Sequence, residues 1–344
     1  MCAGAGKWAL AIARQRSAER EQWGKPIGRH EVIGTKLAFI AATTFVLEAV
    51  FELSAELVAG KARDIRIEAA AAKLWSSEMA CLIADELVQL RGGRGYETAE
   101  SLATKGERAV GAEQLLRDLR INRIFEGSSE IMRLLIAREA VDARLRAAGA
   151  LASADATFGA KAKAAASASG FYARWLPPLV VGAGSLPTSY GEFGHLARHL
   201  RFVERTSRRL ARQTFYGMGR WQAKLEHHQA FLCRIVDIGS ELFAMSAACT
   251  RAEMLRATDP AKGATAYRLA DAFCEKSRLR IRSSFDALWH NTDAAGVRLA
   301  GSVLEREYLW LEEGVHDLSE GTGPWVAVQA PGPSSKENQR RHYR

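Results

Sequence analysis

The stretch from residue 64 to residue 90 constrains the fold of this chain more than any other. Its apolar residues recur in steps of three and four, which places them on one face of an α-helix. Gly92 and Gly93 follow and end that helix. The apolar positions are Ile67, Ala71, Leu74, Trp75, Met79, Leu82, Ile83, Leu87 and Leu90. Such a stripe faces a core, so the pattern predicts that other helices cover it.

The rest of the chain carries the same helical signal, and no segment of any length alternates with the period of a strand. Two long antiparallel helices with shorter partners predict an all-α fold, an up-and-down bundle followed by a second helical domain. We expect a first helical domain at 1–147, a linker rich in Ala, Gly, Ser and Lys at 148–194, a helical extension at 195–330 and a disordered tail at 331–344. The helices are expected near 3–20, 30–59, 64–90, 112–122, 129–147, 196–210, 222–256, 264–288 and 296–311.

The composition limits the class of protein. The 344 residues, 48% of them hydrophobic, are enough for packed cores in two domains. No apolar run is long enough for a membrane span, and the N-terminus lacks the charged and apolar segments of a secretory signal. Five widely spaced Cys residues predict reduced thiols and a cytoplasmic location. The net charge of +9 could steer an anionic ligand, nucleic acid or an acidic membrane, but an Arg-rich solvated exterior explains it as well.

One acid stands out beside the helical pattern. Glu126 follows the apolar pair Ile124 and Phe125 and precedes a Gly-Ser-Ser turn that opens an amphipathic helix. Its apolar neighbours are expected to desolvate the carboxylate in part, whereas the nearby helix terminus favours its charged form. The spacing does not decide between a reactive base and a first-turn acid that the helix dipole stabilises.

Four segments in this order resemble the signature of the acyl-CoA dehydrogenase family. Arg20-Glu-Gln-Trp-Gly-Lys-Pro-Ile27 is similar to the family's Arg-x-Gln-Phe-Gly-Lys-Pro-Ile loop, and Gln89-Leu-Arg-Gly-Gly-Arg-Gly-Tyr96 is similar to its Gln-x-x-Gly-Gly-x-Gly-Tyr turn. Arg117-Asp-Leu-Arg120 then leads into the segment from Ile124 to Arg138, Ile-Phe-Glu-Gly-Ser-Ser-Glu-Ile-Met-Arg-Leu-Leu-Ile-Ala-Arg. The resemblance covers about residues 4 to 145, the family's C-terminal helical domain. The extension after it resembles the added helices of very-long-chain acyl-CoA dehydrogenases and acyl-CoA oxidases.

The resemblance implies a function. It implies an FAD-dependent enzyme that removes hydrogen from the α and β carbons of long-chain acyl-CoA thioesters in fatty-acid β-oxidation. Glu126 would be the base, and Gly127 and Arg138 would contact substrate. The electron acceptor would be the electron-transfer flavoprotein, and the assembly a homodimer in which Arg20 reaches across subunits.

The same resemblance implies a set of cofactor contacts. Arg20 would contact the FAD pyrophosphate, and Ser128 would keep a hydroxyl near the flavin. The remaining residues named at the end of this paragraph would line the cofactor. Without the resemblance, Arg20 is a cation at a helix C-terminus and the glycines are a helix stop. Glu31 and Glu130 depart from the family pattern, and 97–107 forms an insertion. The implied contacts are Arg20, Gln22, Trp23, His30, Gln89, Gly92, Gly93 and Ser128.

Other readings remain open at this stage. The family's N-terminal helical and middle β domains have no counterpart here, so we expect a fragment that binds FAD weakly and turns over little. An acyl-CoA oxidase would share the base and the flavin, and a non-catalytic helical module, including a nucleic-acid-binding one, would use the positive charge. The basic stripe from Arg201 to Arg212 predicts a solvated face, with peripheral membrane contact as the alternative. The adjacent His227 and His228 point in different directions, so no metal site is expected.

Overall fold

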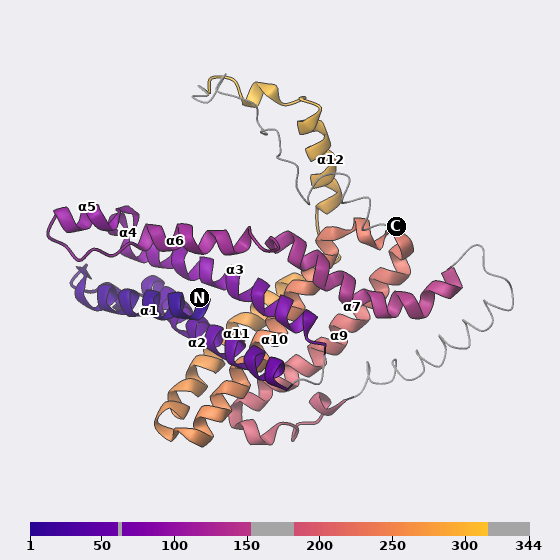
Figure 1. Cartoon of the computed structure of the whole chain (residues 1–344), viewed down its shortest axis with the longest axis horizontal. Coiled ribbons are helices and arrows are strands. Elements are labelled where there is room, and N and C mark those ends of the chain that lie inside the picture. The colour runs from indigo at the N-terminus through magenta and orange to yellow at the C-terminus, as the bar shows by residue number, and fades with distance from the viewer. Residues whose placement is uncertain (61–63, 153–181, 316–344) are drawn as a thin grey trace. The chain divides into compact units, whose positions relative to one another are not determined.

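The computed structural model describes residues 1–60, 64–152 and 182–315. The chain divides into two compact units, Met1–Asn291 and Thr292–Arg344. The described residues are almost entirely helical, which confirms the predicted all-α class; the exception is a pair of two-residue strands. Figure 1 shows the helices in chain order.

The first part of unit 1 is a bundle around α3. This helix packs against α1, α2, α6 and α7, because its apolar stripe covers more than one face along its length (Figure 1). Ile83 and Leu87 of the predicted stripe have no exposed surface. The bounds are α1 Cys2–Glu19, α2 Glu31–Ala59, α3 Arg66–Arg91, α6 Ala112–Arg120 and α7 Ser129–Ala152. The helices predicted here are therefore confirmed to within a few residues at each end.

Two members of the predicted stripe at 64–90 do not lie in the core. Ile67 is 39% exposed and Leu82 is 46% exposed. Leu82 follows buried Cys81 and precedes buried Ile83, so it points about 100° away from each of them around the helix axis. Helical spacing of hydrophobic residues shows which face of a helix is apolar. It does not show how much of that face the neighbouring helices bury.

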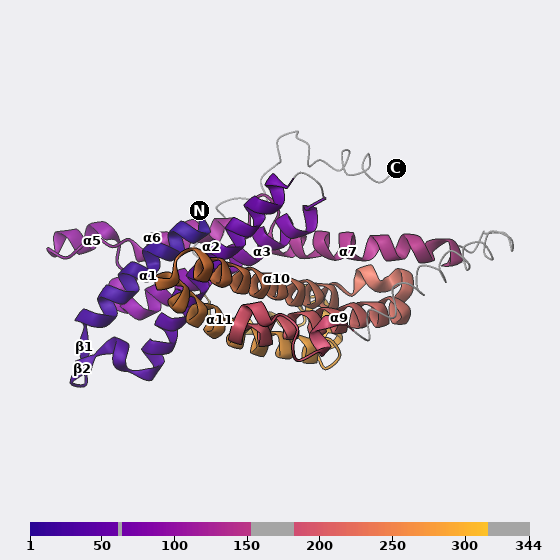
Figure 2. The same cartoon turned by 90° about the horizontal axis from the view of Figure 1, so that it is seen from below.

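The second part of unit 1 shares the core of the first. α10 packs against α2, α3 and α7 as well as against α9 and α11, and α11 also packs against α2. Figure 2 shows α10 beside α11 and α9. The bounds are η3 Ala183–Ser185, η4 Gly191–Leu196, α9 Ala197–Trp221, η5 Gln222–His227, α10 Gln229–Thr258 and α11 Pro260–Ala287. Within unit 1, helices of the predicted domain 1–147 thus share a core with α10 and α11 of the predicted extension, while the division into domains remains a prediction.

The predicted linker and tail lie largely outside the described residues. Residues 148–152 continue α7, residues 153–181 are not described, and the expected tail 331–344 is not described either. In unit 2 the described elements are α12 (Asp293–Leu304) and η6 (Leu309–Leu311). Neither element has a buried residue, and Val297, Leu304 and Trp310 are each more than half exposed.

α2 is long and apolar enough to cross a membrane by length and composition alone. Its residues Ile40, Val46 and Leu47 are buried, and it packs against α1, α3, α10 and α11. The packing gives its hydrophobicity a role in the core of unit 1. A core helix surrounded by neighbours is apolar on nearly every side for the same reason that a membrane helix is.

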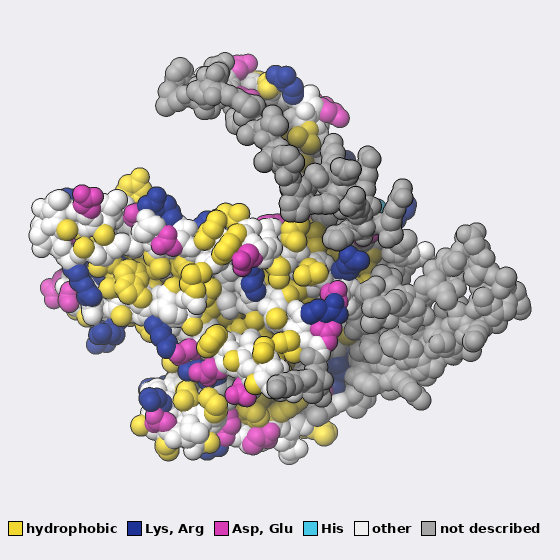
Figure 3. All heavy atoms as spheres, viewed as in Figure 1, with side chains coloured by type: hydrophobic (Ala, Val, Ile, Leu, Met, Phe, Trp, Pro, Cys, Tyr) yellow, Lys and Arg dark blue, Asp and Glu magenta, His cyan; other side chains and the backbone are white. Residues whose placement is uncertain are grey.

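The distribution of Lys and Arg over the surface shows where the net positive charge lies. On the face of the molecule in Figure 3, the Lys and Arg side chains are interspersed with Asp and Glu instead of gathering into one field. The basic stripe on α9 is engaged locally: Arg201 and Arg205 donate to the carbonyls of Ser189 and Gly184 at 2.9 and 2.6 Å, and Arg208 pairs with Glu204 at 2.6 Å. These contacts favour a structural role for the stripe.

The cysteines are all free thiols. The Cys249 and Cys274 sulfurs are 3.9 Å apart in the core between α10 and α11. Within the described residues no group of three or more His, Cys, Asp or Glu side chains could hold a metal ion.

Candidate active site

The predicted base lies on a tight loop between a 3-10 helix, η2 (Ile121–Arg123), and α7. Glu126 has φ of +51° and Gly127 has φ of +91°, so two consecutive residues are left-handed. The φ of +91° at Gly127 strains any L side chain, which makes glycine necessary there, and a Cβ would also displace the Met132 sulfur 2.6 Å away. A non-glycine residue in the left-handed region costs about 1 kcal/mol or more, and such residues cluster at functional sites.

The turn after Glu126 starts α7 as the sequence predicts. The Ser128 hydroxyl accepts a hydrogen bond from the Ile131 amide at 3.4 Å, and the Ser128 carbonyl accepts one from Met132 at 2.8 Å. Ser128 is thereby the N-cap of α7. The backbone and the Ser128 hydroxyl also hold the pKa of Glu130 below its ordinary value. The hydroxyl predicted near the flavin thus has a structural function in the loop.

The surroundings of Glu126 differ from the expectation of partial desolvation. Glu126 is exposed, and in the part of the chain that the structure describes its carboxylate makes no hydrogen bond or ion pair. Ile124, Phe125 and Ile131 around it are also exposed, at 57, 43 and 59%. These apolar side chains form a rim beside the acid, but no described segment packs over them. Glu126 and its apolar neighbours are therefore open to solvent in the described part of the chain.

An ion-pair chain anchors both ends of the loop. Glu78 of α3 pairs with Arg123 before the loop at 3.0 Å and with Arg133 after it at 3.6 Å. Arg133 also donates to Asp237 of α10 at 2.7 Å. Burial raises the pKa of Asp237, although Arg133 acts in the opposite direction. The network links the loop of the first domain to a helix of the extension, and no sequence motif indicated it.

A second group of predicted residues lies at a short hairpin after α1. The strands β1 (Glu21–Gln22) and β2 (Lys25–Pro26) pair antiparallel around Trp23 and Gly24, which have φ of +49° and +75°. His30 Nε2 lies 3.0 Å from the Gln22 carbonyl, and the His30 ring meets the edge of Trp23 at 5.5 Å. Trp23 is 88% exposed. The structure therefore brings Gln22, Trp23 and His30 together on the surface, and Arg20 is exposed where the hairpin begins.

The glycine turn after α3 has one glycine without a structural reason. Gly92 has φ of +61°, and a Cβ at Gly95 would lie 2.3 Å from the Val88 carbonyl oxygen. At Gly93 a Cβ would have nothing within 4 Å. Gln89, Gly92 and Gly93 are exposed. The turn then forms α4 (Gly93–Tyr96), and α5 (Ala99–Thr104) lies within the expected insertion. A helix stop explains Gly92, but open space at Gly93 leaves room for a ligand.

Guanidinium groups from α1, α3 and the segment after α5 gather near the glycine turn. Arg108 donates to Gln15 of α1 at 2.6 Å, which joins the end of α1 to the segment just after the insertion. Burial lowers the pKa of Arg16 and of Arg91, and nearby guanidinium groups lower both further, although the Glu107 carboxylate acts in the opposite direction. The Nε atoms of Arg16 and Arg91 are buried and have no partner among the described residues. Crowded cations with unused donors fit a doubly charged anion such as a pyrophosphate. Sequence reasoning found Arg20 here but missed Arg16 and Arg91.

The predicted site residues therefore form two groups. The axial rise of α3 from Lys73, beside the Glu126 loop, to Gln89, at the glycine turn, is about 24 Å. Arg20, Gln22, Trp23, His30, Gln89, Gly92 and Gly93 belong to the hairpin end, and Glu126, Gly127 and Ser128 to the loop. Arg138 belongs to neither group, because it is exposed and lies about 14 Å along α7 from Ser129.

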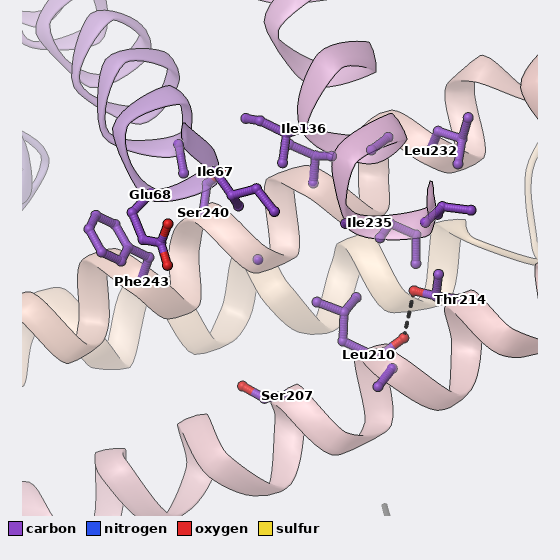
Figure 4. A pocket seen from close by; sticks show the side chains of 17 residues that line it. Ile67, Glu68, Ile136, Ser207, Leu210, Thr214, Leu232, Ile235, Ser240 and Phe243 are labelled. Atoms are coloured by element: carbon purple, nitrogen blue, oxygen red, sulfur yellow. Dashed lines mark hydrogen bonds between the residues drawn. The ribbon is translucent and has the colours of Figure 1, made fainter. Parts of the chain in front are cut away.

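A separate cavity lies between α3, α7, α9 and α10, and Figure 4 shows it. It holds about 270 Å³ and is lined mainly by apolar side chains, including Ile136, Leu210 and Ile235. Thr214 in its wall donates to the Leu210 carbonyl at 2.9 Å. None of the predicted site residues lines it, so it is distinct from both groups.

Comparisons with known proteins agree with the resemblance. Residues 1–141 match the family described as "Acyl-CoA dehydrogenase, C-terminal domain". The first part of the chain is thus similar to the C-terminal domain of acyl-CoA dehydrogenases, and a helical extension follows it. The probable acyl-CoA dehydrogenase FadE10 of Mycobacterium tuberculosis is 66% identical over 340 residues, which are 99% of this chain and 52% of that protein. The chain is therefore related to the acyl-CoA dehydrogenases over nearly its whole length, and spans about half the length of this relative.

A more distant relative matches a smaller part of the chain. The human very long-chain specific acyl-CoA dehydrogenase, a mitochondrial protein, is 37% identical over 136 residues, 39% of this chain and 19% of that protein. Among solved structures, the acyl-CoA dehydrogenase of Bacillus anthracis complexed with FAD has a TM-score of 0.60 at 23% identity, covering 83% of this chain and 47% of that one. Caenorhabditis elegans ACDH-11 in complex with C11-CoA has a TM-score of 0.52 at 16% identity, over 84% and 45%. Both share the fold.

Proposed function

We propose that this chain provides the base-bearing helical part of an FAD-dependent acyl-CoA dehydrogenase that acts on long-chain acyl-CoA thioesters in cytoplasmic fatty-acid β-oxidation. The observation that supports this most is the Glu126 loop: an exposed acid in a left-handed conformation, followed by an obligatory glycine and a capped helix. The name of the 66% identical relative points to the same chemistry.

The reaction assigns a task to each group. The Glu126 carboxylate takes the proton from the carbon α to the thioester, and the Glu126 amide, which donates no hydrogen bond among the described residues, is available for the thioester oxygen. Flavin supplies the acceptor for the hydride that leaves the β carbon. The exposed apolar rim of Phe125 and Ile131 would lie against the acyl chain and exclude water from the carboxylate.

The hairpin end suits the cofactor. A pyrophosphate would accept hydrogen bonds from Arg20 and from the unused Nε donors of Arg16 and Arg91. Gly93 would let the backbone come close to the cofactor, and Trp23 and His30 would offer ring surfaces to it. The residues present therefore fit a dinucleotide.

The distance between the two groups supports a homodimer. With about 24 Å of α3 between them, the hairpin end of one copy would hold the flavin that faces Glu126 of the other. Arg20→Ala and Glu126→Gln should then each abolish activity alone. Mixed and allowed to exchange, the two variants should recover about a quarter of the parent's activity, because half of the dimers are mixed and each of these has one intact site. No recovery would place both groups in one copy.

The first test of the function is flavin reduction. The purified chain is loaded with FAD and mixed with a long-chain acyl-CoA, and flavin absorbance is followed. Glu126→Gln should slow bleaching by about a hundredfold or more, because it removes the general base. Glu130→Gln, a nearby acid in the first turn of α7, is the matched control and should bleach as the parent does. Equal rates for parent and Glu126→Gln would contradict the assignment.

The electron acceptor is tested in the same assay. We propose the electron-transfer flavoprotein, so reoxidation of the reduced flavin should be fast with that protein and slow with dissolved oxygen. Rapid formation of hydrogen peroxide would instead identify an acyl-CoA oxidase. We do not extend the proposal to a membrane contact through Arg201–Arg212, because Arg201, Arg205 and Arg208 bind neighbouring groups of the chain.

A further inference from the structure

One lysine is bound entirely to the loop that carries Glu126. Lys73 lies on α3 and its Nζ donates to the carbonyl oxygens of Asn122 at 3.0 Å, Gly127 at 2.6 Å and Phe125 at 3.4 Å. An ammonium group has three N–H donors and no acceptor, so these three carbonyls use its full capacity. Among the described residues no carboxylate pairs with Lys73, which separates it from the ion pairs elsewhere in the bundle.

The loop itself gives these three carbonyls no backbone partner. Asn122 belongs to η2, whose last carbonyls have no following turn to bind them. The Phe125 carbonyl lies in the peptide plane before Glu126, and the Gly127 carbonyl lies in the plane after Gly127, so the two bonds hold the planes on either side of the pair Glu126 and Gly127. Because Glu126 and Gly127 both adopt positive φ, the loop needs support from outside to stay in this conformation. Lys73 supplies that support from the rigid helix below.

We propose that Lys73 is a positioning residue that holds Glu126 in its left-handed conformation and so aims its carboxylate and its amide. The proposal rests on the proposed role of Glu126 as the base. Lys73 itself touches neither substrate nor cofactor: it acts through the carbonyls of the loop. A shift of about 1 Å in a catalytic group lowers a rate by about a hundredfold, so holding the loop is a sizeable contribution.

The first measurement is hydrogen exchange of the whole chain without ligand. The Ile124 and Phe125 amides both donate to the Ile121 carbonyl, at 2.9 and 3.0 Å, and report the opening of the loop. Lys73→Met keeps the length of the side chain and removes its donors. It should raise exchange at these two amides by about tenfold, the effect of losing a charge-assisted hydrogen bond, and leave α10 unchanged. Lys73→Arg keeps donors and should restore much of the protection.

A matched control separates positioning from general stability. Lys36 of α2 is also a half-buried lysine, but it pairs with Glu86 and has no contact with the loop. Lys36→Met should leave the Ile124 and Phe125 amides unchanged. Unchanged exchange at these amides in Lys73→Met would overturn the proposal. An equal rise throughout unit 1, in α10 as well as in the loop, would also overturn it, because Lys73 would then only stabilise the fold.

The second measurement uses the FAD-loaded chain and acyl-CoA. Lys73→Met should lower the rate constant of flavin reduction at saturating substrate by about a hundredfold and leave FAD affinity unchanged, since the cofactor group is at the other end of α3. If the parent does not reduce flavin at all, this chain by itself does not carry the proposed activity, while the exchange measurement still decides the role of Lys73. If the parent reduces flavin and Lys73→Met does so equally fast, the positioning role fails alone.

Discussion

Ile238 of α10 tests whether the two halves of unit 1 share one core. Its side chain is 1% exposed and lines a cavity of about 380 Å³ together with Leu74 and Trp75 of α3 and Ile281 of α11. Ile→Ala in a core costs about 2–5 kcal/mol, and Ile→Val about 0.5–1.5 kcal/mol. Because Ile238 adjoins an existing cavity with charged walls, water can fill part of the new space, so we expect about 2–3 kcal/mol for Ile238→Ala.

The assay is native-state hydrogen exchange in α3, α10 and α11 of the parent, Ile238→Val and Ile238→Ala. If the halves unfold together, the opening free energies of the slowest amides should fall by the same amount in all three helices. A fall of about 2–3 kcal/mol raises those exchange rates by about 30- to 150-fold. Ile238→Val should give a smaller effect in the same helices. Loss of protection confined to α10 and α11, with α3 unchanged, would refute the shared core and show that the halves unfold independently.

Two further predictions concern the glycine turn and a buried histidine. Gly95→Ala should destabilise the chain by about 1–3 kcal/mol in thermal unfolding, because the new Cβ would clash with the Val88 carbonyl. Gly93→Ala should leave the unfolding temperature unchanged and weaken FAD binding, since a Cβ there has nothing within 4 Å. A drop in the unfolding temperature of Gly93→Ala would refute this. His199 is fully buried against Asp271 at 2.9 Å, and burial lowers its pKa from 6.5 despite that carboxylate. The unfolded state therefore binds more protons below about pH 6.5, so His199 should reduce stability as the pH falls from about 7.5 to 5. Between about pH 7.5 and pH 5, the unfolding temperature of His199→Gln should therefore fall less than that of the parent. An equal fall in both proteins would refute the role of His199 in this pH dependence.

The local features of the site follow from the sequence. The helix after Ser129 begins where the Gly-Ser-Ser turn predicts, and Ser128 caps it. Gly127 is needed for its positive φ and for the contact with Met132. Such features depend on residues within a few positions of one another, so the pattern of residue types is enough to predict them.

The partners of the site were not predictable in the same way. Lys73 precedes the Glu126 loop by about fifty positions, and Asp237 of α10 follows it by more than a hundred. A single lysine in the Ala-rich start of α3 is a weak signal, since most such lysines are solvated. The pair of crowded guanidinium groups of Arg16 and Arg91 has no sequence motif either, because the two residues come from different helices, α1 and α3.

The sequence alone determined that this chain is helical, where most of its helices begin and end, and that it is related to the acyl-CoA dehydrogenases. These properties depend on periodicity, capping and short motifs, which act over one or two helical turns. Only the tertiary structure decided that α10 and α11 share a core with α2 and α3, that Glu126 is open to solvent, and that Lys73 hydrogen-bonds the carbonyls of the Glu126 loop. Those facts depend on which helix faces cover one another, and side-chain packing between distant segments settles that.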